Sequence, residues 1–169
     1  MNTRRIGFDI GGIIIDRVND GTDTSFFGDN YLATTAVPGA FDTIRNARES
    51  FGDKRYLVSK CGARTQERAV QWLAQPRPSL DFHTHTGIPA ESAYFTRTRV
   101  GKCAIAETLS LTDFVDDRLE VLGHLVGLVK RLYLLNAQDE EVAKHQDALP
   151  HVIVVQDMYE LDDLLSSRC

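Results

Sequence analysis

The chain has few of the features that mark secreted, membrane-bound or metal-stapled proteins. Its three cysteines stand at distant spacings, which suits neither a disulfide framework nor a zinc site and predicts reduced thiols. No apolar run approaches the roughly 20 residues that span a bilayer. Residues 1–5 lead into a strand-like run, whereas a signal peptide would continue into an apolar helix. We therefore expect a cytoplasmic protein without a membrane partner.

Clustered positive charge is also missing. The formal net charge is -5, and the 19 lysines and arginines are scattered along the chain. Phosphate backbones are held by grouped basic side chains, so nucleic acid is not expected as a non-specific partner. With 169 residues, 43% of them hydrophobic, the chain suits one compact domain over residues 1–169.

Short apolar runs alternate with helical segments. Strands are predicted over residues 6–10, 55–59, 93–96, 113–116, 131–135 and 151–155. Helices are predicted at about 40–50, 63–74, 102–109, 119–125 and 159–165. This alternation predicts an α/β fold, with a mainly parallel sheet of five to six strands and helices on both faces. Such sheets bind ligands beyond the carboxyl ends of their strands.

Carboxylate, hydroxyl and lysine side chains lie at or just after the ends of four of these strands. They are Asp9 after the first strand, Ser59 and Lys60 after the second, Lys102 in the helix after the third, and Asp116 with Asp117 after the fourth. Grouped carboxylates suit a hard cation such as Mg²⁺, and a hydroxyl and an ammonium group suit phosphoryl oxygens. The alternatives for single residues are a strand cap at Asp9 and a solvated first-turn residue at Lys102.

In order and spacing, this set resembles the haloacid dehalogenase (HAD) superfamily of phosphohydrolases, over residues 6 to about 125. Its motifs are matched by Phe8–Gly12, Tyr56–Ser59, Lys102 and Phe114–Asp117, and Val37–Ala40 is similar to the Pro-Gly before the second strand. The resemblance implies a Rossmann-like HAD fold with a minimal cap at about residues 17–36. It also implies an open site for a phosphorylated small molecule or macromolecule.

The resemblance assigns a role to each matched residue. Asp9 would be the nucleophile that forms an aspartyl-phosphate. Ser59 would hydrogen-bond the transferring phosphoryl group, and Lys102 would pair with both that group and the nucleophile. Mg²⁺ would be held by Asp9, the Gly11 backbone carbonyl, Asp116 and Asp117. Phosphate would be bound by Ser59, Lys60, Lys102 and Gly12.

One position departs from the superfamily pattern. Two residues after the nucleophile these phosphatases carry a second aspartate, the general acid and base, but this chain carries Gly11. General acid–base catalysis supplies about 10²–10⁴-fold, so ordinary phosphate esters should be poor substrates unless another group acts. Asp16 lies a few residues on; one alternative is that it swings in as a substitute acid, but it is expected to face solvent.

Three functions stay open from these residues. The first is a Mg²⁺-dependent hydrolase or phosphotransferase with an atypical general acid. The second is a non-catalytic relative that binds phosphate and metal, and the third is a dehalogenase or phosphonatase-type hydrolase. The aromatic loop at residues 25–31 is either a small lid or a patch for a protein partner. His83 and His85 are predicted to lie in an exposed loop.

Overall fold

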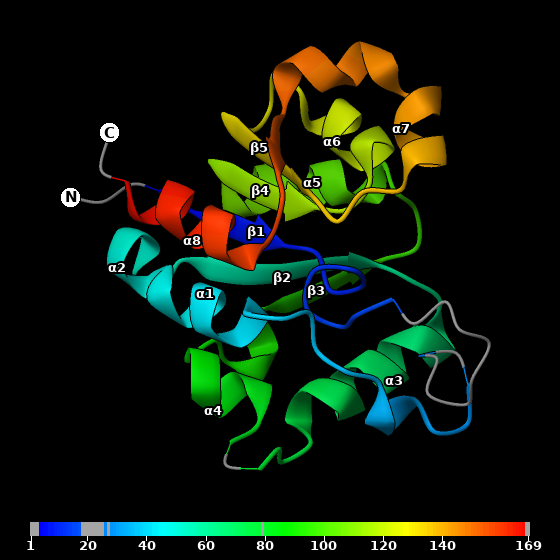
Figure 1. Ribbon diagram of the computed structural model, residues 1–169, viewed down its shortest axis with the longest axis vertical. Coiled ribbons are helices and arrows are strands. Elements are labelled where there is room, and N and C mark those ends of the chain that lie inside the picture. Colours follow the sequence, from blue (N-terminus) through cyan, green and yellow to red (C-terminus); the bar gives the residue numbers. More distant parts are fainter. Residues whose placement is uncertain (1–3, 18–25, 27, 79, 168–169) are drawn as a thin grey trace.

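The computed structural model describes residues 4–17, 26, 28–78 and 80–167. Its centre is a six-stranded, wholly parallel sheet in the order β3-β2-β1-β4-β5-β6 (Figure 1). The strands are β1 (Ile6–Phe8), β2 (Arg55–Lys60), β3 (Ala93–Thr96), β4 (Asp113–Asp116), β5 (Arg131–Leu135) and β6 (Ile153–Val155). The predicted fold class and six strands are confirmed.

Helices cover both faces of the sheet. They are α1 (Ala40–Asn46), α2 (Arg48–Phe51), α3 (Ala63–Ala74), α4 (Phe82–Thr86), α5 (Gly101–Leu109), α6 (Leu119–Leu125), α7 (Asp139–Lys144) and α8 (Met158–Ser166). Three 3₁₀ turns, η1 (Tyr31–Ala33), η2 (Ala90–Ser92) and η3 (Gln146–His151), complete the elements. In Figure 1, α1, α2 and α8 lie on one side of the sheet, and α5, α6 and α7 on the other. Within the described residues, no helix combines the length and the apolar character that a bilayer crossing requires.

The central strands of the sheet are buried on both faces. In β5, Tyr133 and Leu135 pack into the core beneath α1 and α8, while Leu132 and Leu134 pack into the core beneath α5 and α6. The period of two along each strand sends alternate side chains to the two cores. The uninterrupted apolar runs in the sequence follow from this double burial.

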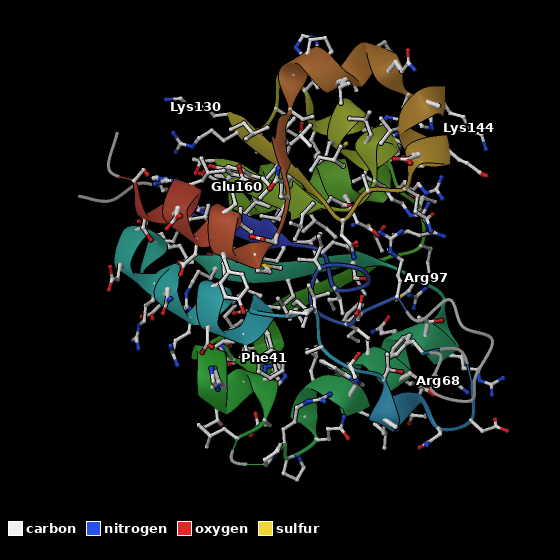
Figure 2. The ribbon with its side chains drawn as sticks, in the orientation of Figure 1. Phe41, Arg68, Arg97, Lys130, Lys144 and Glu160 are labelled. Carbon is white, nitrogen blue, oxygen red and sulfur yellow. The ribbon has the colours of Figure 1, made fainter. Side chains whose placement is uncertain are left out.

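Aromatic contacts join α1 to the helices that flank β2 and β3. Phe41 of α1 packs edge-on against Trp72 of α3 and Phe82 of α4, with ring centroids 6.2 and 5.1 Å apart (Figure 2). Trp72 is fully buried and donates its indole N–H to the Thr34 carbonyl at 2.9 Å. These contacts fix α3, which follows the carboxyl end of β2, against α1 and the Thr34 backbone.

Several predicted boundaries were wrong, each for a local reason. The helix expected over residues 40–50 is interrupted at Ala47, which separates α1 from α2. The last strand starts at Ile153, because η3 takes the residues up to His151. The first strand ends at Phe8, since the Ile10 carbonyl accepts the amides of Ile14 and Ile15 in a tight turn.

The loop predicted around His83 and His85 was also wrong. Both residues lie in α4, which Asp81 caps by accepting the Thr84 amide at 2.9 Å. His83 Nδ1 contacts the Ile88 carbonyl, and His85 Nε2 contacts Asp42 Oδ1, both at 2.9 Å. The two imidazoles therefore have separate structural partners.

Candidate active site

Asp9 stands just beyond β1, at the carboxyl edge of the sheet. Its amide donates to the Val115 carbonyl of β4 at 2.9 Å, which continues the ladder one residue past the strand. The turn that follows needs glycine at position 12, where φ is +78° and a Cβ would lie 2.3 Å from Asp117 Oδ2. The backbone thus packs closely against the carboxylates, as the Gly-Gly pair predicts.

Lys102 joins two of the predicted carboxylates. From the first turn of α5, its Nζ donates to Asp9 Oδ1 at 2.9 Å and to Asp116 Oδ2 at 2.7 Å. Its side chain is only 3% exposed, and Asp116 is fully buried. The other oxygen of Asp116 accepts the Arg118 amide at 3.0 Å. Both oxygens of the Asp116 carboxylate are therefore hydrogen-bonded, which fixes the orientation of the group.

Asp117 completes a cluster of three buried carboxylates. Asp9, Asp116 and Asp117 can each place one oxygen within 4.8 Å of the others. Lys102 and Arg17, which lies 3.2 Å from Asp117, are the cations paired with this cluster in the described structure. Three ionised carboxylates would thus exceed the paired positive charge by one unit.

The excess of negative charge changes the protonation of the cluster. Burial, together with the Asp116 carboxylate, raises the pKa of Asp9 to about 6, although Lys102 opposes the shift. Burial and the neighbouring Asp9 and Asp116 raise the pKa of Asp117 to about 8. Burial would lower the pKa of Lys102, but its two carboxylate partners raise it. The Lys102 ammonium stays charged, while Asp9 and Asp117 keep their protons to a higher pH than an ordinary aspartic acid.

A cavity of about 410 Å³ opens over the cluster. The predicted site residues that line it are Asp9, Gly11, Gly12, Ser59, Lys60 and Asp117. A second hollow of about 250 Å³ shares Asp9 and Lys60 and adds Lys102 and Asp116. The structure therefore brings every predicted site residue to one place. Ser59 is buried and Lys60 is exposed at the mouth.

Two backbone groups of the glycine turn are already used. The Gly12 amide donates to the Ile15 carbonyl at 2.8 Å, and the Gly12 carbonyl accepts Asn136 Nδ2 at 3.1 Å. Gly12 therefore forms a fixed wall of the cavity. At Gly11, by contrast, a Cβ would meet no atom within 4 Å, and φ is not positive.

Several polar residues on or behind the cavity wall were not among those predicted for the site, and four of them bear on its charge and geometry. They are Asp16, Arg17, Arg118 and Asn136. Asn136 directly follows β5, so the rule that ligands gather at strand ends would have found it. Asp16, which was expected to face solvent, is half-buried and lines the larger cavity.

The aromatic loop predicted at residues 25–31 contributes Phe26 to the cavity wall. Arg68 of α3 donates to the Phe26 and Gly28 carbonyls at 3.1 and 3.0 Å, and its guanidinium stacks over the Tyr31 ring at 4.7 Å (Figure 2). Ser25 and Phe27 lie outside the described residues. Both hypotheses for this loop, a lid and a partner patch, remain predictions.

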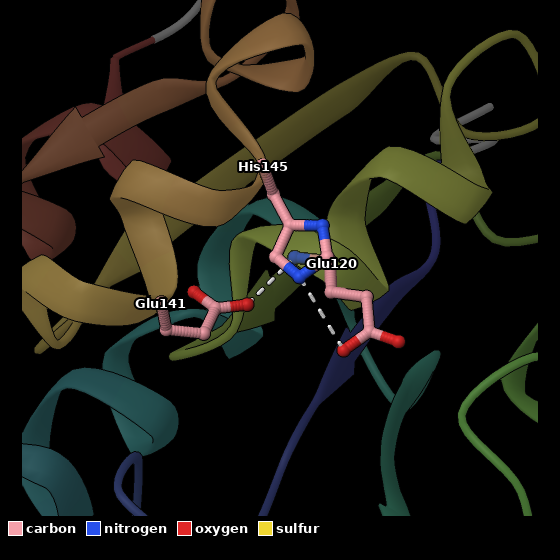
Figure 3. Close-up of side chains that lie close together, drawn as sticks. All are labelled: Glu120, Glu141 and His145. Atoms are coloured by element: carbon pink, nitrogen blue, oxygen red, sulfur yellow. Dashed lines mark hydrogen bonds and ion pairs between the residues drawn. The ribbon is translucent and has the colours of Figure 1, made fainter.

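A second group of metal-ligand residue types lies near α6 (Figure 3). Both oxygens of Glu141 accept backbone amides at 2.9 Å, from Leu119 and Glu120, so Glu141 caps the start of α6. Glu120 pairs with Arg99 and lies 3.7 Å from His145 Nε2. Helix capping and ion pairing account for this group, and we assign it no metal.

No protein-family model and no curated protein matches the sequence. Among solved structures, the chain is similar to D,D-heptose 1,7-bisphosphate phosphatase from B. bronchiseptica complexed with magnesium and phosphate, with 12% identity, coverage of 96% of this chain and 98% of that one, and a TM-score of 0.61. It is also similar to a HAD family hydrolase from Deinococcus radiodurans R1 with bound phosphate and sodium, with 12% identity, 99% coverage of both chains and a TM-score of 0.62. The heptose bisphosphate phosphatase from Burkholderia thailandensis gives 16% identity, 98% and 100% coverage, and a TM-score of 0.57.

Proposed function

We propose that this chain, which has the fold of HAD phosphatases, is a Mg²⁺-dependent phosphohydrolase or phosphotransferase with Asp9 as its nucleophile. The observation that carries the proposal is Lys102, whose ammonium joins Asp9 to Asp116 beside a third buried carboxylate. When its three carboxylates are ionised, the cluster carries one more negative charge than Lys102 and Arg17 neutralise. The phosphate bound by the structural neighbours supports a phosphorylated substrate.

The donor set suits a hard divalent cation. Mg²⁺ prefers carboxylate and carbonyl oxygens and usually retains several waters. In our proposal it is held by Asp9, Asp116 and Asp117 with the Gly11 carbonyl. The three carboxylates are buried and line the two adjoining cavities, and burial together with neighbouring carboxylates raises the pKa of Asp9 and of Asp117, which supports a cation between them. When bound, the cation would neutralise charge on the phosphoryl oxygens.

The chain's own groups supply the remaining chemistry. An ionised Asp9 oxygen attacks phosphorus and forms an aspartyl-phosphate. Lys102 keeps Asp9 oriented by its 2.9 Å hydrogen bond and presents positive charge to the reacting group. The Ser59 hydroxyl donates to a phosphoryl oxygen, Lys60 attracts the substrate at the mouth, and Gly12 forms the wall beside the phosphate.

A substrate larger than phosphate fits this site. The 410 Å³ cavity is open to solvent beside Lys60, so a phosphorylated small molecule or the phosphorylated end of a macromolecule can enter. The free thiols of Cys61 and Cys103 support a cytoplasmic setting. A partner at the aromatic loop would enclose the cavity from the side of Phe26.

Gly11 favours a second candidate, a non-catalytic protein that binds phosphate and metal. The position where the superfamily keeps its general acid has no side chain. Such a protein would retain the metal and phosphate contacts while failing to turn over any ester.

Metal binding tests the site first. Saturating Mg²⁺ should raise the melting temperature of the wild type, because a ligand that binds only the folded state stabilises it. Asp116→Ala should abolish this rise. Asp163→Asn, an exposed aspartate on α8, is the matched control and should retain it. Equal stabilisation of Asp116→Ala would contradict the metal assignment.

Fluoroberyllate tests the nucleophile, because it mimics an aspartyl-phosphate by bonding to the carboxylate. Calorimetry should show binding that requires both Mg²⁺ and Asp9, and Asp9→Asn should not bind. A panel of phosphate esters, anhydrides and acyl phosphates then measures turnover with and without Mg²⁺. Binding that depends on Asp9 without turnover would select the non-catalytic candidate.

A further inference from the structure

We infer that Asp16 is the general acid and base of this site, in place of the acid missing at Gly11. The inference rests on the proposed function and adds a catalytic residue to it. It starts from the backbone of the glycine turn, which brings two stretches of the loop together.

A parallel bridge pairs Gly11 with Ile15, and the Gly12 amide donates to the Ile15 carbonyl at 2.8 Å. Asp16 directly follows Ile15, so this bridge fixes the chain one residue before Asp16. The Asp16 amide donates to the Thr35 carbonyl at 2.9 Å, which fixes the backbone on its other side. Asp16 is therefore held next to the turn.

The space beside Gly11 is open to the side chain of a neighbouring residue. A Cβ at Gly11 would meet nothing within 4 Å, so the volume that a second aspartate would occupy is open. The half-buried Asp16 lines the same cavity as Asp9 and Ser59. Its carboxylate has no hydrogen bond or ion pair with any residue in the described part of the chain.

Other groups around the cavity are less suited to the role. Among its described lining residues, Asp9 and Asp117 belong to the nucleophile and metal set, and histidine is absent. Burial raises the pKa of the Cys61 thiol, which makes it a weaker acid. The charged groups that share the cavity with Asp16 are Asp9, Arg17, Lys60, Asp117 and Arg118. Asp16 is the carboxylate left without another task.

The proposed sequence balances protons over two steps. First, an Asp9 oxygen bonds to phosphorus, the bond from phosphorus to the leaving oxygen breaks, and protonated Asp16 gives its proton to that oxygen. Second, the Asp16 carboxylate takes a proton from water as the hydroxide bonds to phosphorus. The bond from phosphorus to Asp9 breaks, inorganic phosphate leaves, and Asp16 is again protonated.

Asp16→Asn tests both steps separately. With an alkyl phosphate, whose leaving group needs protonation, phosphorylation of Asp9 should slow by about 10²–10⁴-fold. With acetyl phosphate, phosphorylation should keep the wild-type rate, but the aspartyl-phosphate should accumulate because its hydrolysis lacks a base. Rapid quench and intact-mass analysis measure both quantities. Asp163→Asn is the control and should behave as wild type.

Rescue separates a catalytic role from a structural one. Gly11→Asp has room and an ordinary backbone, so Gly11→Asp combined with Asp16→Asn should recover much of the alkyl phosphate rate. Asp16→Glu should retain part of it, and melting curves check folding of each variant. Unchanged single-step rates in Asp16→Asn, or equal slowing with both substrates and no accumulation, would overturn the inference. If the wild type does not bind fluoroberyllate, or binds it no better than Asp9→Asn does, the proposed function itself is contradicted.

Discussion

Strand β4 begins and ends with a buried aspartate. The aspartate at its start is surrounded by arginines, whereas the aspartate at its end lies in a group of carboxylates. At its start, Asp113 accepts hydrogen bonds from Arg131 at 2.7 Å, Arg4 at 3.0 Å and Thr112 at 2.6 Å. Burial would raise the pKa of Asp113, but the bonds from Arg131 and Arg4 lower it below its ordinary value. This carboxylate is satisfied within the fold.

At the other end, Asp116 shares one lysine with Asp9 and stands beside Asp117. Here the pKa values of Asp9 and Asp117 are raised, because burial and mutual repulsion exceed the compensation from Lys102 and Arg17. Burial acts to raise the pKa at both edges. At the amino edge the hydrogen bonds from arginine reverse this shift, whereas at the carboxyl edge the neighbouring carboxylates add to it.

Removing Asp9 should give the largest effect. We expect Asp9→Asn to lower turnover by on the order of 10³-fold or more, because the covalent step is lost. Its metal-free melting temperature should stay the same or rise, since one repelling carboxylate is neutralised. Kinetics and thermal denaturation measure the two quantities. If Asp9→Asn is destabilised and keeps its turnover, Asp9 has a structural role like that of Asp113.

Asp113→Ala should show the reverse pattern. It leaves Arg4 and Arg131 without their buried partner, and we expect unfolding free energy to fall by about 3 kcal/mol. This figure is at the low end for a broken buried pair, because both arginines are partly exposed. Turnover per folded molecule should be unchanged. Urea denaturation and activity at a temperature where the variant is folded provide the measurements.

The pH dependence of stability should separate the edges more finely. The folded-state pKa values of Asp9 and Asp117, about 6 and about 8, lie above the ordinary value of 3.8. The folded protein therefore binds more protons than the unfolded chain, and metal-free stability should fall as pH rises from 5.5 to 8.5. We expect a loss of roughly 3–6 °C, or about 1–2 kcal/mol for a chain of this length.

Two controls identify the source of this slope. Saturating Mg²⁺ should remove it, because the cation compensates the ionised carboxylates. Asp117→Asn should flatten it without metal, whereas Asp163→Asn should not. A slope that persists in Asp117→Asn at full size would assign the effect to other titrating groups.

Arg17 gives the smallest expected effect. Its ion pair with Asp117 is 3.2 Å long and partly exposed, so it is worth at most about 1 kcal/mol. Arg17→Met should therefore tighten Mg²⁺ binding by up to about five-fold, because a competing positive charge is removed. Calorimetric titration with Mg²⁺ measures the change. Weaker binding in the variant would show that Arg17 supports the metal-bound state.

The sequence by itself determined the order of elements and the position of the site along the chain. Short, uninterrupted apolar runs predict β4 and β5, because both faces of a parallel sheet are buried. The parallel connection then carries the end of every strand to one edge, which is enough to group Asp9, Ser59 and Asp116 before any contact is known.

Short helices and exact ends were beyond the sequence pattern. The segment of α4 has too few residues to show a helical period, and its cap at Asp81 resembles an ordinary turn. The break between α1 and α2 has no proline or glycine to announce it. At α4, the packing of Phe82 against Phe41 stabilises a helix that the local sequence leaves open.

The tertiary structure alone decided which charges meet. The resemblance implies that Lys102 pairs with Asp9, 93 residues away, but nothing in the sequence states that the same ammonium also pairs with Asp116. Arg17 is likewise paired with Asp117 only because the chain folds back over the glycine turn. The same turn brings Asp16 to the cavity through the Gly11–Ile15 bridge. Electrostatic energies depend on distance in space and on burial, and both are set by packing between segments that the sequence separates.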